Sequence, residues 1–282
     1  MISIIIVNYN VLCFLKECIK SIYNSDLKQN FEIIIIDNNS PEPLLGSFDK
    51  NDNIKIYQFT SNKGFAKAVN FGISKSNGDY ILSLNPDTLV HRNTLNILSQ
   101  YLDLNKDVGV VGCKVVYPNG KYQLSSKRHF PTLSIIITLF LKLDKIFPAN
   151  RFFGKYNYTY LDENKLACVD AVSGSCMMFK KEILNDIGNF DENFFLYFED
   201  TDFCYRAIKK DYKVVYNPDC KIVHHKRESF KNSNKNSNFE FYKSFYIFYN
   251  KYNFDYKNNF LIKLLFKFIL FNYVKLLKFS NK

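Results

Sequence analysis

Short, almost continuously apolar runs alternate with segments of helical periodicity over residues 1–117. We expect strands at ISIIIV, EIIIID, IKIYQF, YILSLN and VGVVGCKVVY, and helices over residues 12–23, 65–75 and 94–102. Strands that lack polar alternation are buried on both faces, which is typical of a parallel sheet covered by helices. The pattern predicts an α/β fold of the nucleotide-binding type, in which ligands lie beyond the carboxyl ends of the strands.

The second half of the chain is patterned less regularly. YPNGKY contains the Asn-Gly pair of a tight turn, and CVDAVSGSCMMFKK predicts a strand. The apolar segment over residues 132–147 predicts a buried helix, with a membrane-facing or acceptor-facing helix as the alternative. A short helix ended by Gly188 should follow the strand predicted in CVDAVSGSCMMFKK, and KVVYNPDCKIVHHK predicts one or two strands. The polar linker KRESFKNSNKNSN separates these elements from the C-terminal segment.

Composition and cysteine usage narrow the class of protein. With 282 residues, of which 47% are hydrophobic, the chain can bury a substantial core, which excludes a disordered protein. The seven cysteines are scattered, odd in number and free of any CxxC pair, and the N-terminus enters a strand directly. We therefore expect a cytosolic protein without a disulfide framework.

The positive charge is concentrated at the C-terminus. Of the formal net charge of +11, residues 230–282 hold +8, because ten lysines face only Glu240 and Asp255. In LIKLLFKFILFNYVKLLKF, the four lysines fall within an arc of roughly 120° at helical pitch, and the remaining surface is almost wholly apolar. We interpret this segment as an interfacial helix on an anionic membrane, the alternative being an amphipathic helix packed on the rest of the protein.

Polar residues follow the predicted strands where a ligand would lie. Asp37 ends the second strand, where its carboxylate can accept hydrogen bonds from a base or a ribose, the alternative being an Asx-rich turn. Asn62 and Gly64 precede a predicted helix that contains Asn70, so backbone N–H groups can face an anion unless this is an ordinary capped helix. The chain has no GxGxxG and no GxxxxGK[ST], which argues against a dinucleotide dehydrogenase and a P-loop NTPase.

Two further residue types suggest a metal. SLNPDT places Asp87 at the end of an apolar strand, where its carboxylate can hold one position of an octahedral Mg²⁺ or Mn²⁺ beside a diphosphate. His224 and His225 close the run CKIVHH, and an imidazole can complete the coordination. The alternatives are a turn or helix-cap aspartate and a structural histidine.

The segment NFDENFFLYFEDTDFCYR, residues 189–206, combines five carboxylates with five phenylalanines and two tyrosines. Glu199, Asp200 and Asp202 can complement the dipole in the first turn of a helix, with an Asp202–Arg206 pair four residues apart. That interpretation leaves the aromatic residues unexplained. An apolar wall raises the pKa of a carboxylate and excludes water, which favours a general base that removes a proton from a hydroxyl.

The order of the motifs resembles a known family. SIIIVNYN, IIIIDNNS, NKGFAKAVNFGI, ILSLNPDT, VSGSCMMFKKEIL, GNFDENFFLYFEDTDFCYR and IVHHKRES follow each other as in the family 2 glycosyltransferases, specifically the rhamnosyltransferase-like group, over about residues 2–250. The resemblance implies a GT-A fold, with a Rossmann-like mixed sheet flanked by helices and C-terminal amphipathic helices. It also implies an inverting transfer of a sugar from a nucleoside diphosphate to an acceptor hydroxyl, with Mg²⁺ or Mn²⁺ as cofactor.

Roles follow residue by residue from this resemblance. Asp200 is implied as the catalytic base, and Glu199 and Asp202 as residues that orient the acceptor. Asp87 and His224 are implied at the metal, although NPD lacks the first acid of a full DxD motif and HHKRES lacks the family's frequent glycines. The residues implied to contact the nucleotide sugar are Asp37, Asn39, Gly64, Asn70 and Asn85.

The resemblance also implies a division of the chain into domains, a donor, an acceptor and a cellular location. Residues 1–229 would form the catalytic domain, with a nucleotide-binding half (1–117) and an acceptor-binding half (118–229), and residues 230–282 a membrane-associated tail. The implied donor is dTDP-rhamnose, with galactofuranosyl, glucosyl or amino-sugar transfer as alternatives. The implied acceptor is a glycan, in particular a lipid-linked one used for bacterial O-antigen or capsule, at the inner face of the cell membrane.

Two other classes of protein remain as alternatives. A single-stranded nucleic-acid-binding protein would use the Lys-rich, aromatic tail, but lysines on one helical face suit a bilayer better, so we expect no nucleic-acid partner. A sugar-nucleotide nucleotidyltransferase has a similar sheet, but it would open with a glycine-rich loop that VNYNVLCF lacks.

Overall fold

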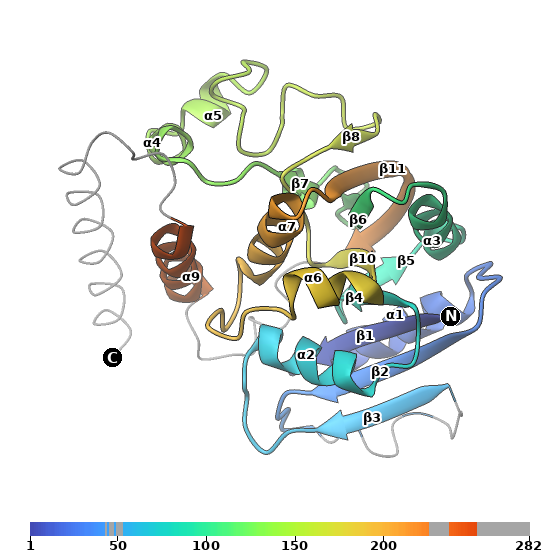
Figure 1. Cartoon of the computed structure of the whole chain (residues 1–282). Coiled ribbons are helices and arrows are strands. Elements are labelled where there is room, and N and C mark those ends of the chain that lie inside the picture. Colours follow the sequence, from blue (N-terminus) through green and yellow to red (C-terminus); the bar gives the residue numbers. More distant parts are fainter. Residues whose placement is uncertain (43, 45–47, 49–52, 226–236, 253–282) are drawn as a thin grey trace.

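The predicted strands of the N-terminal half form a parallel block. The computed structural model describes residues 1–42, 44, 48, 53–225 and 237–252 (Figure 1). The four strands of this block pair in the order β3-β2-β1-β4, all parallel, so their carboxyl ends share one edge. They are β1 (Ile2–Asn8), β2 (Phe31–Asp37), β3 (Ile54–Gln58) and β4 (Tyr80–Leu84).

The other half of the sheet contains both strand directions. In the described residues the sheet has nine strands and continues from β4 in the order β10-β6-β11-β5, with β8 paired to β11. The antiparallel β10 lies between β4 and β6, so the sheet is mixed. These strands are β5 (Thr88–Val90), β6 (Val108–Val116), β8 (Ala167–Cys168), β10 (Cys176–Lys180) and β11 (Lys213–His224).

Helices cover both faces, as the unbroken apolar strands predict. In β1, Ile4 and Ile6 pack with α1 and α3, whereas Ile5 and Val7 pack with α2, α7 and α9, because successive side chains point to opposite faces. The helices are α1 (Leu12–Tyr23), α2 (Phe65–Lys75), α3 (Thr94–Leu104), α6 (Leu184–Ile187), α7 (Glu199–Lys209) and α9 (Ser237–Tyr252).

The irregular middle differs from expectation in two places. CVDAVSGSCMMFKK is three strands, not one, because a turn over residues 173–175 separates β8 and β9 (Ala171–Val172) from β10. The helix predicted over residues 132–147 is split into α4 (Leu133–Phe140) and α5 (Leu143–Ile146), and it is buried on one side of α4 only. Ile135 is buried, but Leu141 and Ile146 are exposed. Upstream of α4 lie η1 (Leu124–Ser126) and β7 (Lys127–Arg128), and η2 (Lys181–Ile183) precedes α6.

The predicted C-terminal tail begins with a helix that packs on the rest of the molecule. Phe248 and Tyr249 of α9 are fully buried, and Phe248 lies against Phe198, next to α7. Residues 237–252 therefore belong to the same core as residues 189–206, which we call the acidic segment (Figure 1). The lysines of the predicted interfacial helix lie at 263–278, outside the described residues. Within the described residues, no helix combines the length and apolarity needed to cross a bilayer.

Candidate active site

Asp87 and His224 meet at the carboxyl edge of the sheet. Antiparallel pairing of β11 with β5 sets His224 opposite Thr88, and His224 Nε2 lies 3.3 Å from Asp87 Oδ1. Their side chains are only 10% and 6% exposed. Asn85, which follows β4, completes the group, because its Nδ2 lies 3.4 Å from His224 Nε2. The structure thus brings together Asp87 and His224, which the resemblance implies at the metal, and Asn85, which it implies at the nucleotide sugar.

A buried glutamine orients the histidine. Gln123 is fully buried, and its Nε2 donates to the His224 carbonyl at 2.7 Å and to the Val116 carbonyl at 3.4 Å. Its Oε1 therefore faces His224 Nδ1 at 3.2 Å and accepts the ring proton there. In the neutral ring this leaves the Nε2 lone pair directed toward Asp87. Metal-binding histidines are oriented in the same way, by a hydrogen bond to the other ring nitrogen.

The donor set fits a hard divalent cation that is shared with a substrate. When the ring is neutral, Asp87 Oδ1 and the lone pair of His224 Nε2 face each other with no proton between them. A cation bound by both atoms would satisfy these two acceptors. The described residues contain no group of three or more His, Cys, Asp or Glu side chains able to hold a metal alone. Mg²⁺ commonly takes one or two protein ligands and completes its shell with substrate phosphates and water. Asp87 and His224 therefore suit a cation that arrives with a diphosphate.

Asp200 lies at the start of α7 in a dense set of hydrogen bonds. Its Oδ2 accepts from Arg128 Nη2 at 2.6 Å and from the Gly174 N–H at 2.8 Å. Its Oδ1 accepts from the Thr201 N–H at 2.6 Å and from the Thr201 hydroxyl at 3.1 Å. Burial lowers the pKa of the Arg128 guanidinium, but the Asp200 charge, nearby Tyr156 and the hydrogen bond to Asp200 together raise it by more, so the net pKa is raised. Arg128 thus remains a cation beside the carboxylate.

Glu199, next to Asp200, has the opposite environment. It is buried, and its Oε2 has no hydrogen-bond partner. Burial, and secondly the charge of Asp200, raise the pKa of Glu199 to about 8. When different environments move the pKa values of two adjacent carboxyl groups apart, one group can act as an acid and the other as a base. At neutral pH Glu199 is mainly a neutral acid that can donate a hydrogen bond.

Two short segments connect the group formed by Asn85, Asp87 and His224 to the pair of carboxyl groups of Glu199 and Asp200. In the turn over residues 173–175, the Ser175 carbonyl accepts from the Asn85 N–H at 3.0 Å, while the Gly174 N–H donates to Asp200. Upstream of α4, Gln123 orients His224 and Arg128 binds Asp200 only five residues later. Sequence reasoning missed Gln123 and Arg128, because QLSSKR has no pattern that distinguishes it from a polar loop.

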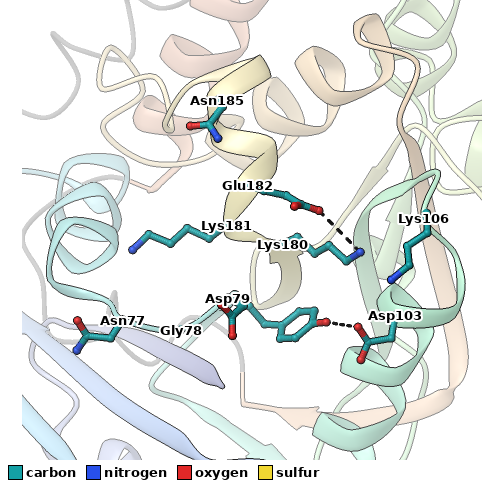
Figure 2. A pocket seen from close by; sticks show the side chains of 10 residues that line it. Asn77, Gly78, Asp79, Asp103, Lys106, Lys180, Lys181, Glu182 and Asn185 are labelled. Atoms are coloured by element: carbon teal, nitrogen blue, oxygen red, sulfur yellow. Dashed lines mark hydrogen bonds and ion pairs between the residues drawn. The ribbon is translucent and has the colours of Figure 1, made fainter.

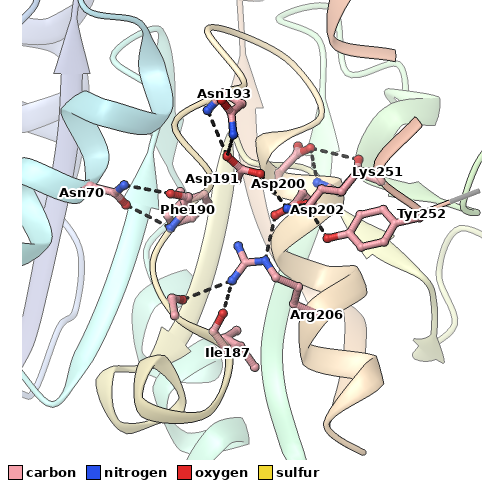
Figure 3. A network of polar contacts seen from close by, with 12 residues as sticks. Asn70, Ile187, Phe190, Asp191, Asn193, Asp200, Asp202, Arg206, Lys251 and Tyr252 are labelled. Atoms are coloured by element: carbon pink, nitrogen blue, oxygen red, sulfur yellow. Dashed lines mark hydrogen bonds and ion pairs between the residues drawn. The ribbon is translucent and has the colours of Figure 1, made fainter. Parts of the chain in front are cut away.

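Asp202, which the resemblance implies as a residue that orients the acceptor, makes contacts within the protein in this structure. It is fully buried: Oδ2 accepts from Arg206 Nε at 2.8 Å, and Oδ1 accepts from Lys251 Nζ and the Tyr252 hydroxyl, both at 2.6 Å. Lys251 also binds Asp191 at 2.6 Å. Figure 3 shows the side chains of α9 directed at this carboxylate from the side opposite Arg206. Asp202 therefore joins α9 to α7.

The residues implied to contact the nucleotide make protein contacts in this structure. Asp37 is fully buried and accepts from Asn8 Nδ2 and from the Ser40 N–H and hydroxyl, so it orders the loop after β2. Asn39 is exposed in that loop with φ of 69°. Asn70 exchanges two hydrogen bonds with the Phe190 backbone, at 2.8 and 3.0 Å (Figure 3).

The helix start at Gly64 is closed by the acidic segment. The Phe65 N–H donates to the Phe195 carbonyl at 2.7 Å, and the Gly64 N–H donates to Asn62 Oδ1 at 3.0 Å. A Cβ at Gly64, whose φ is 87°, would lie 2.7 Å from the Phe195 oxygen. These N–H groups therefore do not face a ligand here, and glycine is required because the backbones of the two segments touch.

A cavity of 510 Å³ lies away from both groups. Asp79 and Tyr80 at the amino end of β4 line it, with Lys180 and Lys181 at the end of the antiparallel β10 (Figure 2). Its charges are largely compensated, because Lys180 pairs with Glu182 and Asp79 pairs with the N-terminal ammonium. It lies at the edge of the sheet opposite Asn85 and Asp87, so we do not assign the chemistry to it.

Solved structures define the class of fold. A mannosyltransferase from Pyrobaculum calidifontis in complex with GDP-Man and Mn²⁺ has a TM-score of 0.62 at 18% identity, over 97% of this chain and 68% of its own. A crystal structure of GalNAc-T7 with UDP, GalNAc and Mn²⁺ also has a TM-score of 0.62, at 16% identity, over 79% of this chain and 43% of its own. The chain has the GT-A fold, as its sequence motifs imply.

Family membership follows from the sequence match. The model of glycosyl transferase family 2 matches residues 3–188, so the chain belongs to this family. A low-salt glycan biosynthesis hexosyltransferase of Haloferax volcanii is 28% identical over 79% of this chain and 65% of its own length. The N-acetylglucosaminyl-diphospho-decaprenol L-rhamnosyltransferase of Mycobacterium tuberculosis is 25% identical over 70% of this chain and 67% of its own. The chain thus matches about two thirds of each of these relatives.

Proposed function

We propose that the chain is an inverting, metal-dependent glycosyltransferase that moves a sugar from a nucleoside diphosphate to a hydroxyl of a glycan acceptor. One observation supports this most strongly: the Asp87–His224 pair and the Glu199–Asp200 pair flank the same turn, residues 173–175. Asn85 binds this turn from one side and Asp200 from the other. A donor diphosphate at the first pair would direct its sugar toward the second.

Asp87 and His224 would hold the divalent cation, with Gln123 fixing the ring so that Nε2 is the ligand atom. When bound, such a cation neutralises charge that develops on the leaving diphosphate. Asn85 lies beside both residues, so its amide can contact the donor. On this basis residues 1–117 form the nucleotide-binding half, and His224 reaches it from the second half of the chain.

Asp200 would remove the proton from the acceptor hydroxyl. Its carboxylate is held by Arg128 and Gly174, so its position is fixed before the acceptor arrives. Of its four hydrogen bonds, the one from the Thr201 hydroxyl is the longest at 3.1 Å, and this hydroxyl can rotate away to admit an acceptor oxygen. Transfer with inversion needs one base only, and a positioned base contributes roughly 10²- to 10⁴-fold to the rate.

Glu199 would bind the acceptor as a neutral acid. Its unpartnered Oε2 is available to donate to an acceptor oxygen while the pKa stays near 8. The buried Phe198, which directly precedes it, would help to keep water from competing with the acceptor. Asp202 has no part in this step, because α9 and Arg206 occupy its oxygens.

We infer dTDP-rhamnose as the donor and, as the acceptor, a lipid-linked glycan of bacterial O-antigen or capsule synthesis. The match to a rhamnosyltransferase that acts on N-acetylglucosaminyl-diphospho-decaprenol supports both choices. The match to a hexosyltransferase keeps glucosyl, galactofuranosyl and amino-sugar transfer as alternatives. We place the protein in the cytoplasm, peripheral at the inner face of the membrane.

The test is a donor panel read by release of nucleoside diphosphate. The full chain is incubated with dTDP-rhamnose, UDP-galactofuranose, UDP-glucose, UDP-N-acetylglucosamine and GDP-mannose, with Mn²⁺, Mg²⁺ or chelator, and with prenyl-diphospho-N-acetylglucosamine as acceptor. We expect acceptor-dependent release from one donor, stopped by chelation and by Asp200→Asn. Release of nucleoside diphosphate that does not depend on the acceptor, or that persists with chelator, contradicts the proposal.

A further inference from the structure

An apolar surface is exposed on the segment that follows Arg128. Eleven large apolar side chains of the described residues are exposed, and five of them fall within residues 137–152. They form what we call the α4–α5 surface: Ile137, Leu141, Ile146, Phe147 and Phe152, with 47 to 62% of each exposed. Clusters of this kind on a soluble fold mark sites of contact with a protein or a membrane.

These side chains form one surface. Leu141, the C-cap residue of α4, is four residues after Ile137, so the two side chains lie on the same side of the helix. α5 packs against α4, and both lie at one end of the molecule, apart from the sheet (Figure 1). Ring contacts continue the surface, because Phe153 lies 5.5 Å from Phe147 and 5.4 Å from Phe152 between ring centroids.

The charges around the surface are basic. Residues 137–155 contain four basic side chains against a single acid, Asp144. Lys142, Lys145 and Arg151 are exposed between the apolar side chains. Lys142 occupies the left-handed region with φ of 56° and separates α4 from α5. An apolar face bordered by lysine and arginine is the composition that binds the interface of anionic bilayers.

The charge of the remaining chain argues for a bilayer as the occupant. Residues 253–282, outside the described part, carry six lysines against Asp255, so they have the same sign as the surface and cannot neutralise it. A second copy of this chain would bring the same positive surface. An anionic lipid headgroup layer neutralises both basic segments at once.

We propose that the α4–α5 surface docks on an anionic lipid bilayer, with its apolar side chains in the interface and its basic side chains at the headgroups. α4 begins five residues after Arg128, which binds Asp200, so docking would bring a bilayer next to the segment that holds the carboxyl pair. The docking itself requires neither donor nor acceptor, so its test is independent of the proposed transfer.

The chain has no tryptophan, so one substitution gives a unique fluorescent reporter. Phe152→Trp in the full chain is mixed with phosphatidylcholine vesicles with or without phosphatidylglycerol, and with brominated versions of the same lipids. We expect a blue shift and quenching by brominated lipid with the anionic vesicles only, reversed by high salt. Leu104→Trp, at an 83% exposed site on α3, is the matched control and should not respond.

Vesicle sedimentation measures the contribution of the surface. Ile146→Ser/Phe152→Ser should lower partition into anionic vesicles by roughly tenfold, because two apolar side chains leave the interface. Leu104→Ser/Leu166→Ser, which removes exposed side chains elsewhere, should bind as the wild type does. Three results overturn the proposal: no vesicle binding by the wild type, binding that leaves the Phe152→Trp emission unchanged, or emission that is already shielded before vesicles are added.

Discussion

Arg128 Nη2 lies 2.6 Å from Asp200 Oδ2, with both side chains largely buried and 72 residues apart in the chain. The contact connects β7 to the start of α7. It holds the carboxylate that we propose as the base, and it places a cation beside that carboxylate. A carboxylate left buried without this partner would lose both its position and its counter-charge.

Arg128→Met should lower the free energy of unfolding by about 3 kcal/mol, since removal of one partner leaves a buried charge unpaired. Urea denaturation of the single variants and of Arg128→Met/Asp200→Asn measures this. The double variant should be more stable than Arg128→Met alone. A double variant that loses the sum of the two single changes would show that the pair is not coupled.

Asp200→Asn should still fold, although with a lower melting temperature because the buried Arg128 cation loses its counter-charge. It should lose transfer by roughly a thousandfold, because an amide cannot accept the proton. The measurement is the rate of acceptor-dependent release of nucleoside diphosphate at saturating donor. Affinity for the donor, measured separately, should be unchanged. Transfer within roughly tenfold of the wild type would rule out Asp200 as the base.

Glu199 should make stability depend on pH. Its pKa is raised from 4.5 to about 8, so the folded state keeps a proton that the unfolded chain has lost. Its contribution to stability is therefore complete below pH 4.5 and is lost as pH rises through 8, with a slope of up to about 1.4 kcal/mol per pH unit between them. Urea denaturation from pH 5 to 9 should show this decline in the wild type. Glu199→Gln should be flatter, and equal slopes would contradict the burial of an uncompensated carboxyl group.

Asp202 and Lys251 should act on stability and not on acceptor binding. Lys251→Met removes a cation from a fully buried carboxylate, which should destabilise the protein by about 2 kcal/mol and increase hydrogen exchange in α9. Lys243→Met, whose half-exposed side chain lies 3.7 Å from Glu240 on the same helix, is the control and should cost less than Lys251→Met. A raised KM for the acceptor in Asp202→Asn at full stability would instead support its implied role as an acceptor ligand.

The sequence predicted the parts of the structure that depend on local periodicity. The helices at residues 12–23 and 65–75 have the expected bounds, because their apolar spacing and flanking residues are local signals. The order of β10 between β4 and β6 was not predictable, because strand pairing across 90 residues has no local signature. α4 was predicted to be buried from its apolar composition alone, and composition does not indicate whether anything covers a helix.

The site was predictable at the residues that follow strands and not at the residues that support them. Asp87 and His224 were identified because polar residues directly after apolar runs stand out. Gln123 contacts His224 across 101 residues, so nothing in a single sequence marks it. The contacts of Asp202 were not predictable for a related reason: Lys251, which binds it, lies 49 residues later, in a segment that was expected to be a separate tail.

The central claim is that Asp87 and His224 form a metal-dependent site for a nucleoside diphosphate. The most direct test is a thermal-shift and calorimetric titration of the full chain with dTDP, UDP, GDP, ADP and a short RNA, each with and without Mn²⁺. The wild type, Asp87→Ala and the control Asp79→Ala, at the opposite edge of the sheet, are compared. We predict that one nucleoside diphosphate binds the wild type and Asp79→Ala only with Mn²⁺, and that Asp87→Ala abolishes this binding. Binding that survives in Asp87→Ala, or a response to RNA alone, would contradict the account.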